Sequence, residues 1–117
     1  MVMGSLRQEA EVAIIGAGPG GYVAALRAAD LGKEVVLIEE REQLGGVCLL
    51  EGCIPSKTLI NAVDLAESAK AADQIGLSFR ELVIDLDKLR GWSESVITGL
   101  TSGIGGLLAR RGVEVIH

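Results

Sequence analysis

The sequence predicts an α/β fold, part of a doubly wound parallel sheet with a long helical excursion before the third strand. Three observations support this prediction. Short apolar runs rich in β-branched residues occupy residues 12–15, 35–38 and 113–116, as in buried parallel strands. A glycine-rich turn and a helix rich in Ala and Leu, residues 22–31, separate the first two runs. From residue 86 to about residue 111, apolar residues recur every three or four positions, which predicts an amphipathic helix.

Composition narrows the class of protein. The chain has 117 residues, 49% of them apolar, which is enough for one small core. We expect a tail at residues 1–10 and one partial domain at residues 11–117. The net charge of −5 gives no sign of a nucleic-acid-binding face. No apolar run reaches the roughly 18 residues of a membrane helix, and the first residues lack the apolar stretch of a signal peptide. We therefore expect a cytoplasmic protein that binds neither membranes nor nucleic acids.

A glycine-rich turn follows the first predicted strand and opens the first predicted helix. In this context Gly16 permits the tight turn, Gly18 lets a pyrophosphate approach the backbone, and Gly21 lets the helix pack on the strand. The free N–H groups and dipole of the helix N-terminus favour phosphate. Glu39 ends the second strand, 23 residues after Gly16, where a carboxylate can accept hydrogen bonds from ribose hydroxyls. The alternative is an ordinary glycine turn with a solvated acid at a strand end.

The two cysteines of the chain, Cys48 and Cys53, lie five positions apart in the segment 45–57. In a regular α-helix, Cα atoms at this spacing lie more than about 8 Å apart, whereas a disulfide needs them within about 7 Å. A bonded pair therefore requires a break in the helix, and Gly52 lies where such a break is needed. A helix is expected at residues 59–72 after Pro55. Its predicted buried positions are Ile60, Val63, Leu65 or Ala66, and Ala69.

Three interpretations of the cysteines remain open at this point. A structural zinc site needs four ligands, and the chain offers only two thiols and the distant His117. Two inert buried cysteines are a second possibility. A redox-active pair is the favoured interpretation, since Lys57 can stabilise a thiolate or an anionic cofactor nearby. The alternative for Lys57 is a solvated lysine on a helix.

Taken together, these motifs resemble those of the FAD-dependent pyridine nucleotide–disulfide oxidoreductases. The resemblance covers the chain from about Glu11 onward. The ending Ile-Pro-Ser-Lys is most similar to the dihydrolipoamide dehydrogenase branch of the family. Mercuric and glutathione-type reductases share the same overall arrangement of motifs. The residues that carry the resemblance are residues 16–21, Glu39, Leu44, Gly45, Gly46, Cys48 and residues 52–57.

The resemblance implies FAD as the cofactor and a Rossmann-like FAD-binding domain. It implies that Cys48 exchanges with the dithiol substrate, that Cys53 faces the flavin, and that Lys57 favours the negative charge of reduced flavin. Glu39 would hold the adenosine ribose, with Glu40 beside it. NAD would be the co-substrate of the complete enzyme, and no metal is expected. The other residues expected at the cofactor are Gly16, Gly18, Pro19, Gly20, Gly21, Gly45, Gly46 and Val47.

The chain departs from the family pattern at Val47, Leu50 and Glu51, where Thr, Asn and a small apolar residue are usual. The first two changes each remove a polar side chain near the cofactor. The glycines of the long helix, Gly99, Gly103, Gly105 and Gly106, are expected to pack closely on a neighbour.

Three strands make half of the expected sheet, in the order 3-2-1, so the outer edge of the first strand is predicted to be bare. We therefore expect function to need a downstream polypeptide or a homodimer partner, with a small dithiol or a lipoyl domain as substrate. The alternative function is a truncated redox-sensing or partner-binding module without catalysis.

Overall fold

The computed structural model describes residues 9–117, so most of the predicted tail lies outside the described residues. Three parallel strands form one sheet in the order β1-β2-β3, which confirms the α/β prediction and places β1 at an edge. The strands are β1 (Val12–Ile15), β2 (Val35–Ile38) and β3 (Glu114–Ile116). The helices are α1 (Pro19–Asp30), α2 (Gly46–Leu50), α3 (Cys53–Ala71), the 3-10 helix η1 (Ala72–Ile75) and α4 (Leu86–Arg110).

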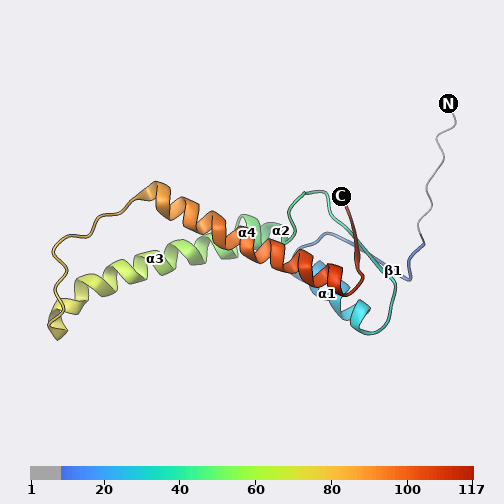
Figure 1. Cartoon of the computed structure of the whole chain (residues 1–117), viewed down its shortest axis with the longest axis horizontal. Coiled ribbons are helices and arrows are strands. Elements are labelled where there is room, and N and C mark those ends of the chain that lie inside the picture. The colour runs from blue at the N-terminus through green and yellow to red at the C-terminus, as the bar shows by residue number, and fades with distance from the viewer. Residues whose placement is uncertain (1–8) are drawn as a thin grey trace, which may run out of the picture.

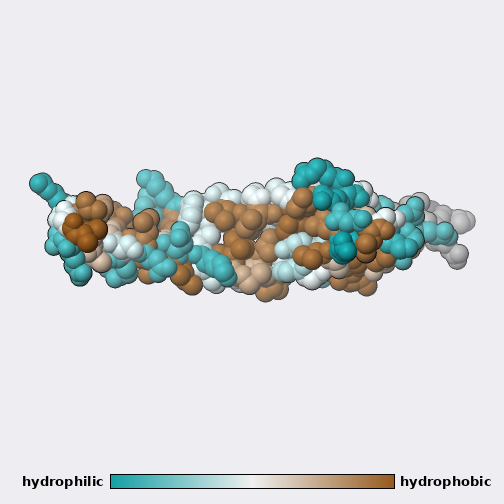
Figure 2. Space-filling model, turned by 90° about the horizontal axis from the view of Figure 1, so that it is seen from below, coloured by the Kyte–Doolittle hydropathy of each residue, from teal (hydrophilic) through white to brown (hydrophobic). Residues whose placement is uncertain are grey.

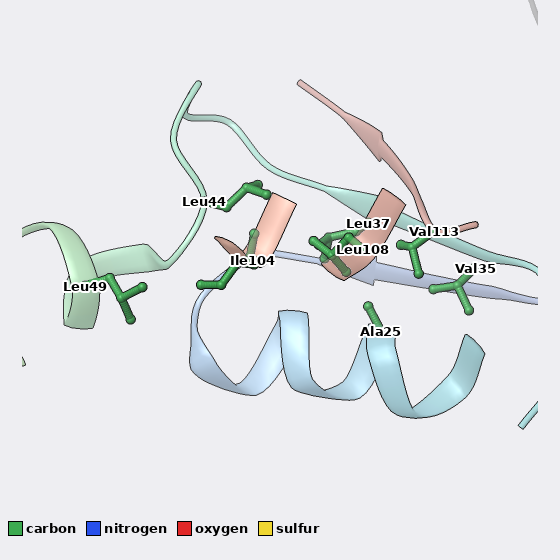
Figure 3. Packing of buried hydrophobic residues seen from close by; sticks show 9 residues of the cluster. Ala25, Val35, Leu37, Leu44, Leu49, Ile104, Leu108 and Val113 are labelled. Carbon is green, nitrogen blue, oxygen red and sulfur yellow. The ribbon is translucent and has the colours of Figure 1, made fainter. Parts of the chain in front are cut away.

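The core lies between the sheet, α1 and the C-terminal half of α4 (Figure 3). Leu37 of the central strand and Leu108 of α4 are the largest fully buried side chains of the described residues. Ala25 is also fully buried, and its small side chain lets α1 lie close to the sheet. By contrast, Ile15 at the end of β1 is 86% exposed. Among residues 9–117, β1 pairs on one side only, in agreement with the edge position predicted for the first strand.

The helices α3 and α4 run side by side away from the sheet as a long hairpin (Figure 1). We call residues 59–92 the helical arm. The molecule measures 72 × 37 × 19 Å because of it. The apolar face predicted to be buried is mostly exposed: Ile60, Val63 and Leu65 are 58%, 59% and 71% exposed. The prediction of a buried face was wrong because helical periodicity locates an apolar stripe without showing that anything covers it. Figure 2 shows brown, apolar patches along the length of the molecule on the face in view.

Several boundaries differ from the prediction for reasons of helix chemistry. Helix α1 begins at Pro19 rather than residue 22, because the first helical position needs no N–H donor. For the same reason α3 includes Pro55 in its first turn and begins at Cys53 rather than residue 59. The predicted close packing of Gly99 and Gly103 was wrong, since a Cβ at either position would meet nothing within 4 Å. Within residues 9–117, no helix is both long and apolar enough to cross a membrane.

Candidate functional site

In the glycine-rich turn between β1 and α1, backbone conformation or close packing excludes a side chain at some of the glycines. Gly16 has φ +94°, in the left-handed region that favours glycine. A Cβ on Gly21 would lie 1.7 Å from the carbonyl oxygen of Gly16, so no other residue fits there. Gly18 is the N-cap of α1, with Pro19 at its first position. A Cβ on Gly20 meets nothing within 4 Å, so Gly20 faces open space at the helix start.

The Gly45–Gly46 turn packs directly against this glycine turn. The Gly45 N–H donates to the Ala17 carbonyl at 2.9 Å. A Cβ on Gly46 would lie 2.7 Å from the Cα of Gly18. Both Gly45 (φ +117°) and Gly46 (φ +60°) have left-handed backbone conformations. The structure therefore brings the two glycine motifs into backbone contact, although they lie far apart in the sequence.

Glu39 lies buried at the carboxyl end of β2, against the same turn. Its carboxylate accepts hydrogen bonds from the Ala17 N–H at 2.7 Å and from the Arg41 N–H at 3.1 Å. The Ala17 bond is the main cause that lowers the pKa of Glu39 below its ordinary value, and burial opposes it. The carboxylate is thus held ionised and oriented by backbone donors of the glycine turn and its own loop.

A cavity of about 390 Å³ opens beside Glu39, outside the carboxyl ends of the strands. Ligands of open α/β sheets bind at this end of the strands. His117 belongs to its wall, and the His117 Nδ1 lies 2.7 Å from the Arg41 carbonyl oxygen. From the sequence, His117 was expected to be an ordinary residue at the end of the third strand and too distant to complete a zinc site, because no local motif marks a residue that lines a cavity. The lining residues are Ile15, Gly16, Ile38, Glu39, Glu40 and His117.

The two cysteines lie on either side of a break between two helices. Cys48 is in α2 and is partly buried, whereas Cys53 is the first residue of α3 and is exposed. Gly52 supplies the break, and a Cβ there would lie 3.2 Å from the Val47 carbonyl oxygen. Both thiols are free in this structure. A hydrogen bond with the Cys53 thiol is the main cause that raises the pKa of Cys48, and partial burial adds to it.

Lys57 lies one helical turn after Cys53 on α3 and is exposed. Its positive charge acts in the opposite direction on the Cys48 pKa, lowering it. The two thiols and the ammonium group therefore lie within electrostatic range of one another. Among the described residues, no group of three or more His, Cys, Asp or Glu side chains is placed to hold a metal ion.

Two of the residues that depart from the family pattern, Val47 and Glu51, lie close to the cysteines. Val47 is 61% exposed and lies next to Cys48. Glu51, at the end of α2 between the two cysteines, forms an ion pair with Arg41. Because the Arg41 N–H also bonds to Glu39, one residue connects the buried acid with the break between the cysteines.

Comparison with known proteins identifies one family and, within it, relatives that share one name. A family model described as "Pyridine nucleotide-disulphide oxidoreductase" matches residues 10–117. A protein of Bacillus subtilis named dihydrolipoyl dehydrogenase is 48% identical over 116 residues, which is 99% of this chain and 24% of that protein. A protein of the same name from Vibrio cholerae is 49% identical over 109 residues, 93% of this chain and 23% of that protein.

A solved structure, that of LpdA from Mycobacterium tuberculosis, has a similar fold. The TM-score is 0.80 at 30% identity, over 90% of this chain and 22% of that one. The chain thus spans about a quarter of the length of the proteins it matches. The match extends along nearly all of the described sheet and helices.

Proposed function

Because the chain belongs to the pyridine nucleotide-disulphide oxidoreductase family, we propose that it is the FAD-binding and redox-disulfide part of a dihydrolipoyl dehydrogenase-like flavoenzyme. One observation carries the proposal. The backbone contact between Gly18 and Gly46 joins the glycine turn to the helix that holds Cys48. A phosphate-binding turn and a reactive thiol pair are thus built as one unit, as a flavoenzyme that exchanges with a disulfide requires.

The residues of this unit fit the cofactor. Neighbouring backbone leaves no room for a Cβ at Gly21 or Gly46, whereas the space beside Gly20 at the N-terminus of α1 is open, so a pyrophosphate could approach the backbone there. Gly16 and Gly18 flank that position. The Glu39 carboxylate lines the cavity, where it could accept hydrogen bonds from ribose hydroxyls. When bound, FAD would supply the electron transfer between thiols and NAD.

The chain's own thiols would exchange with a dithiol substrate. Starting from the oxidised Cys48–Cys53 pair, a substrate thiolate attacks the Cys48 sulfur, and Cys53 leaves as a thiolate. The second substrate thiol then attacks the mixed disulfide, so the substrate is oxidised and Cys48 is released as a thiol. The positive charge of Lys57, one turn after Cys53 on α3, lies near the exchanging thiols, where it attracts negative charge.

The NAD step needs further protein. We propose that a downstream polypeptide supplies the nicotinamide site, with a homodimer partner completing the catalytic site and a lipoyl group as the dithiol. A second candidate is a redox-sensing module that binds a partner, and the exposed edge of β1 and the exposed arm favour it. The N-terminal part of another reductase of the family, such as a mercuric reductase, is a third.

The visible absorption spectrum tests the proposal. The chain, purified and supplied with FAD, is expected to retain flavin absorption and to gain a long-wavelength band when a dithiol is added. C53S should keep the flavin and lose that band. C48S, the matched control in which Cys53 is already a free thiol, should keep the flavin and show the band without added dithiol. Failure to retain any flavin would contradict the cofactor assignment and favour the redox-sensing module.

A further inference from the structure

Helix α3 buries one side chain, that of Thr58, and its partner lies 35 positions later on α4. Thr58 Oγ1 lies 2.7 Å from Ser93 Oγ, and both residues are buried, with 6% and 8% exposure. Thr58 Oγ1 also lies 2.8 Å from the carbonyl oxygen of Pro55. We call these three groups the hydroxyl clasp. It lies where the helical arm joins the part of α3 that carries Cys53 and Lys57.

The hydrogen positions in the clasp follow from the number of donors. A carbonyl oxygen can only accept, so the single hydroxyl hydrogen of Thr58 is donated to Pro55. The Ser93 hydroxyl must then donate to Thr58 Oγ1. The chain of bonds therefore runs from Ser93 through Thr58 to Pro55 and connects α4 with the first turn of α3.

Among the described residues, α3 also packs on α2 and α4, but the bond between Thr58 and Ser93 is the one side-chain hydrogen bond that links α3 to α4. No side chain caps the N-terminus of α3, and Ile54 is the one residue of its first turn that packs on the main core. Beyond Thr58, the side chains of α3 are exposed or half-buried. Apolar contacts tolerate sliding and rotation, whereas a hydrogen bond has a preferred length and direction. The clasp is therefore the directional contact that links the rotation of α3 to α4.

We propose that Thr58 and Ser93 are positioning residues for the Cys48–Cys53 pair, an inference that rests on the proposed function of that pair as redox active. Cys53 is the first residue of α3, and Thr58 follows it by less than one and a half turns. Rotation of α3 would move the Cys53 sulfur relative to Cys48, which α2 holds separately. The clasp keeps the two sulfurs near the separation that a disulfide requires.

The consequence is measurable in a glutathione redox buffer. One thiolate of the pair attacks glutathione disulfide and releases one glutathione, and the other thiolate attacks the mixed disulfide and releases the second. Two thiols of the chain are oxidised to one disulfide while one glutathione disulfide is reduced to two thiols. The equilibrium constant measures the effective concentration of one thiol at the other. Loosening α3 lowers that concentration and makes the disulfide less stable.

The test compares S93A and T58V with the wild-type chain at a temperature well below the unfolding midpoint, with the oxidised fraction read by thiol alkylation and mass spectrometry. S93A removes the bond between the helices and leaves Thr58 bonded to Pro55. We expect both variants to lower the equilibrium constant by about threefold to tenfold, the range of one net hydrogen bond. T58S, which retains the hydroxyl, should restore the wild-type value.

Two controls separate positioning from loss of stability. S95A removes a hydroxyl that bonds only to the Trp92 carbonyl of its own helix, so it should leave the constant unchanged. V35A weakens the core far from the arm, and it should lower the unfolding midpoint without changing the constant. Wild-type constants in S93A and T58V, or an equal loss in S95A or V35A, would overturn the proposal. The measurement needs no flavin, so failure of FAD binding and failure of this inference remain distinguishable.

Discussion

At the scale of single residues, Glu39 shows how a binding group is prepared by the fold before any ligand arrives. Its carboxylate is buried and accepts two backbone N–H bonds, one of them from the glycine turn. A buried carboxylate without such donors would take up a proton, because burial disfavours its charge. The hydrogen bonds outweigh the effect of burial, so the pKa of Glu39 lies below its ordinary value of 4.5.

This pKa shift predicts a pH dependence of stability. Since the pKa is lower in the folded state, ionised Glu39 contributes stability that is complete above the unfolded-state pKa near 4.5 and is lost as the pH falls through the folded pKa. E39Q should therefore lower the free energy of unfolding at pH 7 by about 1.5–3 kcal/mol, the contribution of a hydrogen bond to a charged group. It should also flatten the loss of stability in acid, measured by urea unfolding at several pH values.

The exposed carboxylate of Glu42 offers the matched comparison, and E42Q should leave the free energy of unfolding at pH 7 close to that of the wild type. Glu11, whose pKa a hydrogen bond from Lys33 lowers, is present in all three proteins and does not affect the comparison. If E39Q and the wild-type chain lost stability in parallel as the pH fell, the role given to the Glu39 charge would be wrong.

Alanine substitutions at two adjacent glycines of α1 are expected to have opposite effects on the free energy of unfolding. A Cβ on Gly21 would collide with the Gly16 carbonyl oxygen, so G21A must push the helix away from the turn, at a cost of about 3 kcal/mol or more. A Cβ on Gly20 meets nothing within 4 Å in the same helix, so G20A should stabilise the chain by up to about 1 kcal/mol. Urea unfolding of both variants checks the difference. Equal effects of the two substitutions would contradict the described packing of α1.

At the scale of elements, α4 contains glycines that serve no contact within the described chain. A Cβ on Gly103 would meet nothing within 4 Å, although the residue lies inside a 25-residue helix. G103A should therefore raise the free energy of unfolding by about 0.5–1 kcal/mol, because alanine loses less backbone freedom on forming a helix. A Cβ on Gly105 would lie in ordinary van der Waals contact, 3.8 Å from Leu44, so G105A should stabilise the chain by about as much. A loss of stability in G103A would show a contact that the structure lacks.

The elements also show what local sequence can and cannot determine. The strands β1 and β2 have the predicted bounds, since β-branched runs end abruptly at Gly16 and Glu39. The glycine turn could also be predicted from the sequence, because each glycine of the motif has a defined structural role at a defined position. The contact of Gly46 with Gly18 and the clasp of Thr58 with Ser93 were not predicted, since each joins residues far apart in the chain. No local pattern identifies such partners.

At the scale of the whole molecule, the chain divides into a packed end and an exposed arm. Its radius of gyration is 20.6 Å, whereas a compact domain of this length has about 13 Å. The buried apolar residues gather around β2 and the C-terminal half of α4 (Figure 3). In the arm, the apolar residues of the connection, Leu82, Val83 and Ile84, are 47%, 76% and 60% exposed. Stability is therefore expected to differ between the two ends.

Hydrogen exchange tests this division, because amides exchange faster where few buried contacts oppose local opening. Backbone amides of residues 62–75 in the arm should exchange at least about tenfold faster than those of residues 35–38 and 104–108, a difference of about 1.4 kcal/mol in local stability. Since the hydroxyl clasp lies at the boundary, S93A should raise exchange along α3 and leave β2 unchanged. Uniform protection from residue 53 to residue 108 would mean that arm and sheet unfold as one unit. The thiol pair would then be positioned by the whole fold rather than by contacts at the base of the arm.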